Sequence, residues 1–451
     1  MGERLFGTDG IRGLANTFPM TAEMALRIGR AAAATFRKEE RQHTFLVGKD
    51  TRRSGYMFEN ALTAGLSSMG VNVLLTGPLP TPGVSYIMRS LRCDAAIMIS
   101  ASHNSYPYNG IKFFGPDGYK LPDELEDAIE RQITSGEVDS LAVPNDEIGR
   151  ARRIDDAVGR YIEFAKSSFP KGMRLDGFRI VVDCAHGAAY KVGPATFSEL
   201  GAEVIAIGDK PDGRNINEKC GSMHPDEMRA LVIRERADLG IAFDGDADRI
   251  VMSDEEGRLL DGNALLTILG IDLLERDMLP QKTVATTVMA NGGMESALRE
   301  YGGKVVWTKV GDRYVVEQMR ENGYSLGGES SGHIVMFEHN TTGDALIAGL
   351  QLLACMIRKG QPLSVLANAY RAMPESHRTV PLNGASNRPT GEQLDGIRKE
   401  AEQLLGTSGR AVIRPSGTEP IIRVMVQHHH LKDAETLCNQ LAERIKSLSA
   451  K

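Results

Sequence analysis

The sequence has no long apolar run and no paired cysteines. Its longest apolar stretch, Ala345 to Ile357, is interrupted by Gly349 and Gln351 and is too short to span a bilayer. The opening MGERLFGTDG has no apolar signal core, so we expect no secretory leader. The five cysteines are odd in number and form no CxxC pair, which argues against a zinc knuckle or a disulfide framework. These absences predict a soluble protein of the reducing cytoplasm.

The chain also lacks an excess of positive charge. Its 53 basic and 59 acidic residues leave a net charge of −6, with a pI near 6.0. A general nucleic-acid binder needs clustered Lys and Arg, so we expect no nucleic-acid partner. A small anionic ligand needs only a local basic pocket and is not excluded. With 451 residues, 41% of them hydrophobic, the chain can bury the cores of about three or four domains.

Three segments share one pattern of strand, turn, helix and strand. They begin at TFLVGKD (44–50), FRIVVDC (178–184) and KTVATTVM (282–289). The helical part of each has an apolar stripe, such as Phe58, Leu62, Leu66 and Met69, and ends in glycine. The β-branched runs on either side are typical of buried parallel strands. The pattern predicts three related α/β domains.

The C-terminal part follows a different pattern. A connector rich in Pro and Gly (373–391) precedes an expected helix (392–405), two strands (410–414 and 421–426) and a closing helix (433–448). This order predicts a smaller α+β domain, in which His428 to His430 form a solvated strand end. The predicted domains cover residues 1–153, 154–254, 255–368 and 369–451.

The first polar loop, SASHNSYPYNG, follows an expected strand at 95–99. Ligand sites of α/β sheets gather at the carboxyl ends of strands. Ser102 is therefore a candidate nucleophile or phosphate carrier, with His103 and Lys112 as polar partners. Taken alone, the loop has the composition of an ordinary Ser/Asn-rich turn.

The second loop, AFDGDADRI, has carboxylates at alternate positions: Asp244, Asp246 and Asp248. Strands are expected on both sides of it, at 239–243 and 250–253. Three carboxylates in one turn can bind one hard cation, and without a cation they would repel one another. The twelve-residue spacing of an EF-hand is missing. We therefore expect one Mg²⁺ per chain at this loop.

The third loop, SLGGESSGHIVM, carries Glu329, Ser331 and His333. These side chains offer donors and acceptors to hydroxyl or amino groups. A plain glycine hairpin would have a similar composition.

The fourth loop, RPSGTEPIIRVMV, carries the groups that a phosphate dianion needs. Hydroxyls and free backbone N–H groups lie between two guanidinium groups. The residues are Arg414, Ser416, Gly417, Thr418 and Arg423. A structural turn between two strands is the alternative, but it does not explain both arginines.

The four loops together describe phosphoryl transfer on a phosphorylated sugar. They supply an activatable serine, a divalent ion, a reader of hydroxyl groups and a phosphate clamp. No Walker loop and no adenine-nucleotide signature occur in the sequence. A serine that holds its own phosphate would make ATP unnecessary.

With these loops in this order, the sequence resembles the α-D-phosphohexomutase superfamily, from FGTDGIRG (6–13) to RPSGTEP (414–420). The resemblance implies three mixed α/β domains and a C-terminal α+β domain around a central cleft. It implies a phosphoserine at Ser102 whose phosphate completes a Mg²⁺ site with the three aspartates. It also implies sugar contacts from the third loop and phosphate contacts from the fourth.

Three motifs are similar to the glucosamine branch of this superfamily: GTDGIRG, KDTRRSG (49–55) and KVGDRYV (309–315). That branch implies interconversion of glucosamine 6-phosphate and glucosamine 1-phosphate, for amino-sugar nucleotide and cell-wall precursor synthesis. The 1,6-bisphosphate of glucosamine or glucose would be intermediate or activator. Arg12 and Lys112 are both candidates for a cation or acid/base group beside the transferring oxygen, and Lys112 would need a lowered pKa to act as a base.

Other functions are compatible with the same loops. Mannose or glucose phosphates are the alternative substrates within the superfamily. A phosphoserine-dependent phosphatase and a phosphosugar sensor without catalysis are alternatives from other classes. The small phosphorylated sugar is the expected partner, and a homodimer is open.

Overall fold

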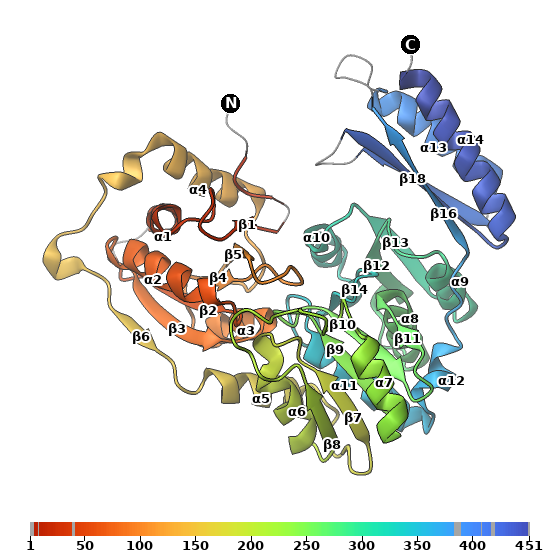
Figure 1. Ribbon diagram of the computed structural model, residues 1–451, viewed down its shortest axis with the longest axis horizontal. Coiled ribbons are helices and arrows are strands. Elements are labelled where there is room, and N and C mark those ends of the chain that lie inside the picture. Colours follow the sequence, from red (N-terminus) through yellow and green to blue (C-terminus); the bar gives the residue numbers. More distant parts are fainter. Residues whose placement is uncertain are drawn as a thin grey trace.

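The computed structural model describes residues 4–7, 9–37, 41–382, 389–406, 408–415 and 420–449. Figure 1 shows four units that follow one another along the chain, each built on its own sheet. The N-terminal unit (red to orange) and the C-terminal unit (blue) stand at opposite ends of the molecule, with the other two between them.

The first sheet has six strands in the order β1-β5-β4-β2-β3-β6. Its strands are β1 (Ile11–Leu14), β2 (Thr44–Lys49), β3 (Asn72–Pro78), β4 (Ala95–Ile99), β5 (Tyr108–Phe114) and β6 (Ala151–Arg153). Its helices are α1 (Ala22–Phe36), α2 (Arg53–Ser67), α3 (Thr81–Ser90) and α4 (Asp123–Ser135), followed by 3-10 turns at Glu137–Asp139 and Asn145–Glu147. Strands β2, β3, β4 and β6 are parallel, whereas β1 and β5 run antiparallel to their neighbours.

The second and third sheets are also mixed. The second has the strand order β11-β10-β9-β7-β8. Its strands are β7 (Arg179–Asp183), β8 (Glu203–Ile207), β9 (Leu239–Phe243), β10 (Ile250–Asp254) and β11 (Leu259–Leu260). Its helices are α5 (Ala157–Ser167), α6 (Val192–Glu199) and α7 (Asp226–Glu235), with a 3-10 turn at Ala188–Tyr190. The third, β13-β12-β14-β15, consists of β12 (Thr283–Thr287), β13 (Lys304–Thr308), β14 (Leu326–Gly328) and β15 (Ile334–Met336). Its helices are α8 (Gly262–Glu275), α9 (Gly293–Glu300), α10 (Asp312–Asn322), α11 (Ala345–Lys359) and α12 (Leu363–Ala367), with a 3-10 turn at Pro280–Lys282.

The predicted strand–helix–strand repeat is confirmed in all three units. The pairs β2/β3, β7/β8 and β12/β13 are parallel, and each is joined through one helix. The glycines expected at the helix ends, Gly70, Gly201 and Gly302, have φ of 82°, 110° and 75°. This left-handed conformation costs glycine little, so the chain can leave each helix and enter the next strand.

One apolar core joins the first three units. It contains Leu46 of the first sheet, Phe243 of the second and Leu326 of the third, all fully buried. The apolar run that begins at Ala345 forms most of α11, which packs against α5, α8, β10 and β15. None of the described helices is long and apolar enough to cross a membrane. The shared core fixes the carboxyl ends of strands from different units relative to one another.

The C-terminal unit has a three-stranded sheet in the order β16-β18-β17. Its elements are β16 (Glu375–Pro381), α13 (Gly391–Leu405), β17 (Gly409–Pro415), β18 (Ile421–His428) and α14 (Leu431–Ser449). The sequence-based interpretation of 373–391 as a connector is wrong at β16. Only Ser376 and Val380 of this strand face inward, so its apolar signal is weak. The strand forms because β18 offers a hydrogen-bonding edge along its whole length.

Candidate functional site

The serine loop lies at the carboxyl end of β4, as expected. Ser102 has a φ of +52° and is 1% exposed. Its Oγ donates a hydrogen bond to Oδ2 of Asp244, at 2.6 Å, from a position 142 residues away in the chain. The fold therefore places the predicted nucleophile directly against the predicted metal loop.

The metal loop is the turn between the antiparallel strands β9 and β10. Its three carboxylates are buried, and one oxygen of each lies within 4.8 Å of the others. Ala247, in the middle of the turn, has a φ of +53°. The turn thus brings the carboxylates of Asp244, Asp246 and Asp248 together at one point, as their alternate spacing predicts.

Asp244 accepts hydrogen bonds at both oxygens, from Oγ of Ser102 and from the backbone N–H of Arg249, whereas Asp246 and Asp248 each keep one oxygen free of hydrogen bonds to the described residues. Thr81, the first residue of α3, donates its hydroxyl to Oδ2 of Asp246 at 2.6 Å, and Lys112 donates to the same oxygen at 3.0 Å. Oδ1 of Asp246 and Oδ1 of Asp248 are buried and have no hydrogen-bond partner among the described residues. Buried carboxylate oxygens without a partner are costly unless a cation binds them. The donor set fits a hard divalent cation.

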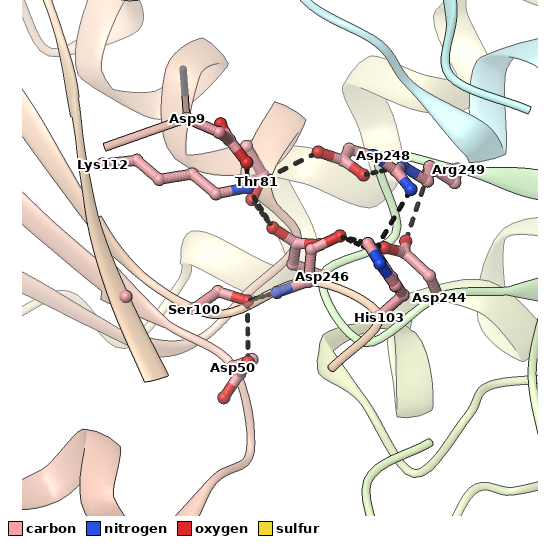
Figure 2. Close-up of polar contacts among 12 residues, drawn as sticks. Asp9, Asp50, Thr81, Ser100, His103, Lys112, Asp244, Asp246, Asp248 and Arg249 are labelled. Carbon is pink, nitrogen blue, oxygen red and sulfur yellow. Dashed lines mark hydrogen bonds and ion pairs between the residues drawn. The ribbon is translucent and has the colours of Figure 1, made fainter. Parts of the chain in front are cut away.

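The crowding of carboxylates shifts the pKa of Asp244. Burial, together with the charges of Asp248 and Asp246, raises the pKa of Asp244 well above its usual value. A bound cation would remove this cost by favouring the ionised form. Figure 2 shows the three carboxylates facing one another, with Lys112 and Asp9 approaching from the first unit.

Lys112 does not have the property that a general base would need. Burial alone would lower the pKa of Lys112, but the carboxylates of Asp246, Asp9 and Asp248 outweigh burial and raise it. Its Nζ lies 3.3 Å from Asp9 and 3.7 Å from Asp248. Among these groups Lys112 stays an ammonium ion, and a role as a cation fits the geometry better than a role as a base.

Arg12 and Asp9 connect this cluster to the start of the chain. Arg12 forms an ion pair with Asp9, which also pairs with Lys112 and Lys120. Burial would raise the pKa of Asp9, but the three cations hold it well below its usual range. Lys120 also forms an ion pair with Asp312 of α10. Arg12 therefore lies near the cluster, held through Asp9, a carboxylate that the sequence-based interpretation did not assign.

His103 lies between the serine and a second arginine. Its Nδ1 is 3.4 Å from Oγ of Ser102 and 3.1 Å from Nη1 of Arg249. Burial, with the charges of Arg249 and Arg12, lowers the pKa of His103 to about 4. The ring is therefore neutral near pH 7 and can accept the hydrogen bond from Arg249. The only sequence signal for Arg249 is its place directly after the three aspartates.

The third loop, here called the sugar loop, is the turn between β14 and β15, and it lies beside the metal loop. His333 forms an isolated backbone bridge with Arg249. Its ring is 2% exposed and lies 3.7 Å from Asp248 and 3.5 Å from Asp312. Burial would lower the pKa of His333, but the two carboxylates outweigh it and raise the pKa. The ring of His333 is therefore buried against the metal loop, and its contact with a sugar stays a prediction.

Glu329 and Ser331 remain at the surface of the same turn. The hydroxyl of Ser331 donates to Oε2 of Glu329 at 3.3 Å, and Glu329 adds to the charge around Arg249. Both side chains are accessible, so they stay available to a hydroxyl or amino group of a ligand.

The phosphate loop belongs to the C-terminal unit, away from the carboxylate cluster. Arg414 of β17 and Arg423 of β18 are paired across the sheet. The other predicted clamp residues, Ser416, Gly417 and Thr418, lie outside the described residues. Arg414 lines a pocket of about 630 Å³, shared with Lys309 of the third unit. Burial and the charge of Arg423 lower the pKa of Arg414.

These observations define a class of protein. A serine hydroxyl lies against a buried carboxylate cluster that fits a divalent cation, and a third loop with accessible polar groups lies beside it. Two arginines stand on a separate C-terminal unit. This is the arrangement that the resemblance to the α-D-phosphohexomutase superfamily implies.

Family models match nearly the whole chain. They are described as phosphoglucomutase/phosphomannomutase alpha/beta/alpha domain I at residues 3–139, domain II at 159–257 and domain III at 261–373, and the C-terminal domain at 373–444. A phosphoglucosamine mutase of Anaeromyxobacter dehalogenans is 52% identical over 99% of both chains. One of Magnetococcus marinus is 53% identical over 99% of this chain and 92% of its own length. The chain belongs to the phosphoglucomutase/phosphomannomutase family, among the phosphoglucosamine mutases.

Solved structures show the same fold. A phosphoglucomutase/phosphomannomutase family protein of Burkholderia thailandensis has a TM-score of 0.83 at 23% identity, covering 100% of this chain and 98% of its own. The N-acetylphosphoglucosamine mutase of Aspergillus fumigatus, in complex with GlcNAc-6P and magnesium, has a TM-score of 0.65 at 18% identity, covering 99% and 96% of the two chains.

Proposed function

We propose that this enzyme interconverts glucosamine 6-phosphate and glucosamine 1-phosphate. The observation that carries the proposal is the contact between Ser102 and Asp244 inside a carboxylate cluster with unpaired buried oxygens. The names of the relatives at 52% and 53% identity support the choice of sugar.

Ser102 would carry the phosphate and donate it to the free hydroxyl of the substrate. The intermediate is a 1,6-bisphosphate, which reorients in the site and returns its other phosphate to Ser102. Atoms balance without ATP or water, because each transfer breaks one P–O bond and forms another. The 1,6-bisphosphate of glucosamine or glucose would also phosphorylate an enzyme that has lost its phosphate.

The carboxylate cluster would hold Mg²⁺ through Asp244, Asp246 and Asp248, with the phosphate of Ser102 as a further ligand. The ion would neutralise charge on the transferring phosphoryl group. Lys112 and Arg12 would add positive charge, and His103 would present a neutral ring beside Ser102.

The remaining loops would hold the sugar and its second phosphate. Glu329 and Ser331 would bind hydroxyl or amino groups of the sugar. The phosphate that is not being transferred would bind the residues of the fourth loop: Arg414, Ser416, Gly417, Thr418 and Arg423. A clamp on a separate unit can accept either end of the bisphosphate, since it does not read the sugar ring.

The organisation of the chain supports a division near residues 153, 254 and 368, where one sheet gives way to the next. Five buried free cysteines fit a reducing cytoplasm. The homodimer stays a prediction.

The test compares wild-type enzyme with Ser102→Ala and with Ser105→Ala, an exposed serine of the same loop. We expect wild type to have its highest kcat/KM on glucosamine 1-phosphate, and Ser102→Ala to lose turnover. Intact-mass spectrometry should show one phosphate on wild type and on Ser105→Ala, and none on Ser102→Ala. Higher kcat/KM on mannose or glucose 1-phosphate would refute the sugar assignment. Turnover by Ser102→Ala above a few per cent of wild type, or steady release of inorganic phosphate at the isomerisation rate, would refute the mutase mechanism.

A further inference from the structure

The side chain of Arg52 is buried under the serine loop. It follows β2, next to β4 in the sheet, and it is 0% exposed. All five N–H donors of its guanidinium group have acceptors. Nε binds Asp50 at 2.8 Å, Nη1 binds the carbonyls of Ser105 and Tyr108 at 2.6 and 3.1 Å, and Nη2 binds those of Ser102 and Asn104 at 2.9 and 2.7 Å. One buried cation therefore holds four carbonyl groups of the loop.

The same network also holds the backbone N–H of Ser102. This group donates to Oγ of Ser100 at 2.9 Å, and Ser100 donates in turn to Oδ2 of Asp50 at 2.7 Å. Asp50 accepts from Arg52, and Arg52 binds the carbonyl of Ser102. The hydrogen bonds close a ring that fixes the peptide groups on both sides of the nucleophile.

Asn217 reaches the loop from the second unit. Its Nδ2 donates to the carbonyls of Ser102 and Asn104, at 2.9 and 3.0 Å. These are the two carbonyls that Nη2 of Arg52 binds, so each carbonyl has two donors. Asn217 is 7% exposed and its backbone N–H donates to the carbonyl of Ala185, which fixes it to the second unit.

The conformation of Ser102 explains why such support is needed. A φ of +52° is rare for residues other than glycine. In this conformation the carbonyl of Ser102 points into the protein and its Oγ reaches Asp244. If the carbonyl were released, the backbone could relax to a commoner conformation and carry Oγ away from the carboxylates.

We propose that Arg52 and Asn217 are positioning residues that keep Ser102 in its left-handed conformation, so that its oxygen faces the metal loop. Their hydrogen bonds to Ser102 go to its backbone carbonyl and leave its hydroxyl to Asp244. The inference rests on the proposed role of Ser102 as phosphate carrier. Asn217 makes the support depend on the docking of the second unit against the first, so the nucleophile is fully aligned only when both units are in place.

The test uses Arg52→Lys and Asn217→Ala, with the exposed neighbour Arg53→Lys as control. Lysine keeps the charge but has three donors on one atom, and it cannot bind four carbonyls in a planar fork. A misplacement of the nucleophile by about 1 Å can cost about 100-fold in rate. We expect kcat to fall about 100-fold for Arg52→Lys and about tenfold for Asn217→Ala, with KM changed less than about twofold. Arg53→Lys should keep wild-type kcat.

A second measurement separates alignment from stability. Dephosphorylated enzyme is mixed with glucose 1,6-bisphosphate, and phosphorylation of Ser102 is followed by intact mass over a single turnover. The variants should take up phosphate more slowly than wild type at a temperature where circular dichroism shows them folded. If Arg52→Lys fails to fold, the result for Asn217→Ala alone decides whether the inference holds. Wild-type phosphorylation rates, or a raised KM with unchanged kcat, would overturn the inference. An active Ser102→Ala enzyme would instead overturn the proposed function.

Discussion

Alanine in place of Gly332 should separate the sugar loop from the metal loop. Gly332 has a φ of +89°, and a Cβ there would lie 2.0 Å from the carbonyl oxygen of Ile250, in the strand that follows the metal loop. Real Cβ contacts stay beyond 3.0 Å, so the two backbones must move apart by about 1 Å. The hydrogen bond from Ile250 N to the carbonyl of Gly332, now 3.1 Å, would be stretched or lost.

The expected loss of activity follows from this displacement. His333, the next residue, packs against Asp248, so its movement would disturb the carboxylate cluster. A shift of about 1 Å at reacting groups can cost about 100-fold in rate. We therefore expect kcat to fall about 100-fold in Gly332→Ala. The positive φ adds a stability cost of about 1–2 kcal/mol.

Gly302→Ala is the matched control. Gly302 has a φ of +75°, but no atom of the part of the chain that the structure describes lies within 4 Å of where its Cβ would be. It incurs the same backbone cost without the clash. Steady-state kinetics and thermal unfolding should be measured on both variants. Gly302→Ala should lose stability and keep its kcat. If Gly332→Ala kept kcat within about threefold of Gly302→Ala, the coupling between the two loops would be refuted.

Asp246→Asn should raise the Mg²⁺ concentration for half-maximal activity at least about tenfold, because a neutral amide binds a hard cation less strongly. This concentration is measured by titrating chelated enzyme with Mg²⁺, with Asp226→Asn as control. Full activity after exhaustive chelation would contradict the metal site. Arg410 stacks on Trp307 at 3.5 Å and donates to two carbonyls of the third unit. Arg410→Ala should therefore weaken the contact between the C-terminal unit and the third unit by about 2–4 kcal/mol. The fluorescence emission of Trp307, the single tryptophan, should shift to the red, and unchanged emission would contradict this prediction. Burial raises the pKa of Cys93 to about 12, and all five cysteines are buried. Near pH 8 the native thiols should react with a thiol reagent about a thousandfold more slowly than in the unfolded chain, and faster as pH rises; rapid labelling of native enzyme would contradict this.

The order of strands and helices could be predicted because its signals are local. Apolar stripes and β-branched runs report burial within a few residues, and the glycines at Gly70, Gly201 and Gly302 have the left-handed φ expected of them. The missed strand β16 shows the limit of such signals. It has little apolar character of its own, and it forms because a distant strand offers it hydrogen bonds.

The candidate site could be predicted only in part for the same reason. Loop composition indicated a nucleophile, a metal cluster and accessible polar groups, and Ser102 does meet Asp244. The sequence could not show that His333 is buried, or that carboxylates from two units raise the pKa of Lys112. Protonation depends on the summed field of groups that are distant in the chain.

The sequence by itself therefore determined the chemistry of each loop and the order of the four units. Both are local properties of composition and periodicity. Only the tertiary structure decided which loops meet and what supports them. The sequence did not show the positioning role of Arg52 and Asn217, although Arg52 lies in the KDTRRSG motif, because that role arises from contacts with carbonyl groups at least 50 and more than 100 residues away. Backbone carbonyls are the same in every residue, so only the folded chain shows which of them a buried donor will bind.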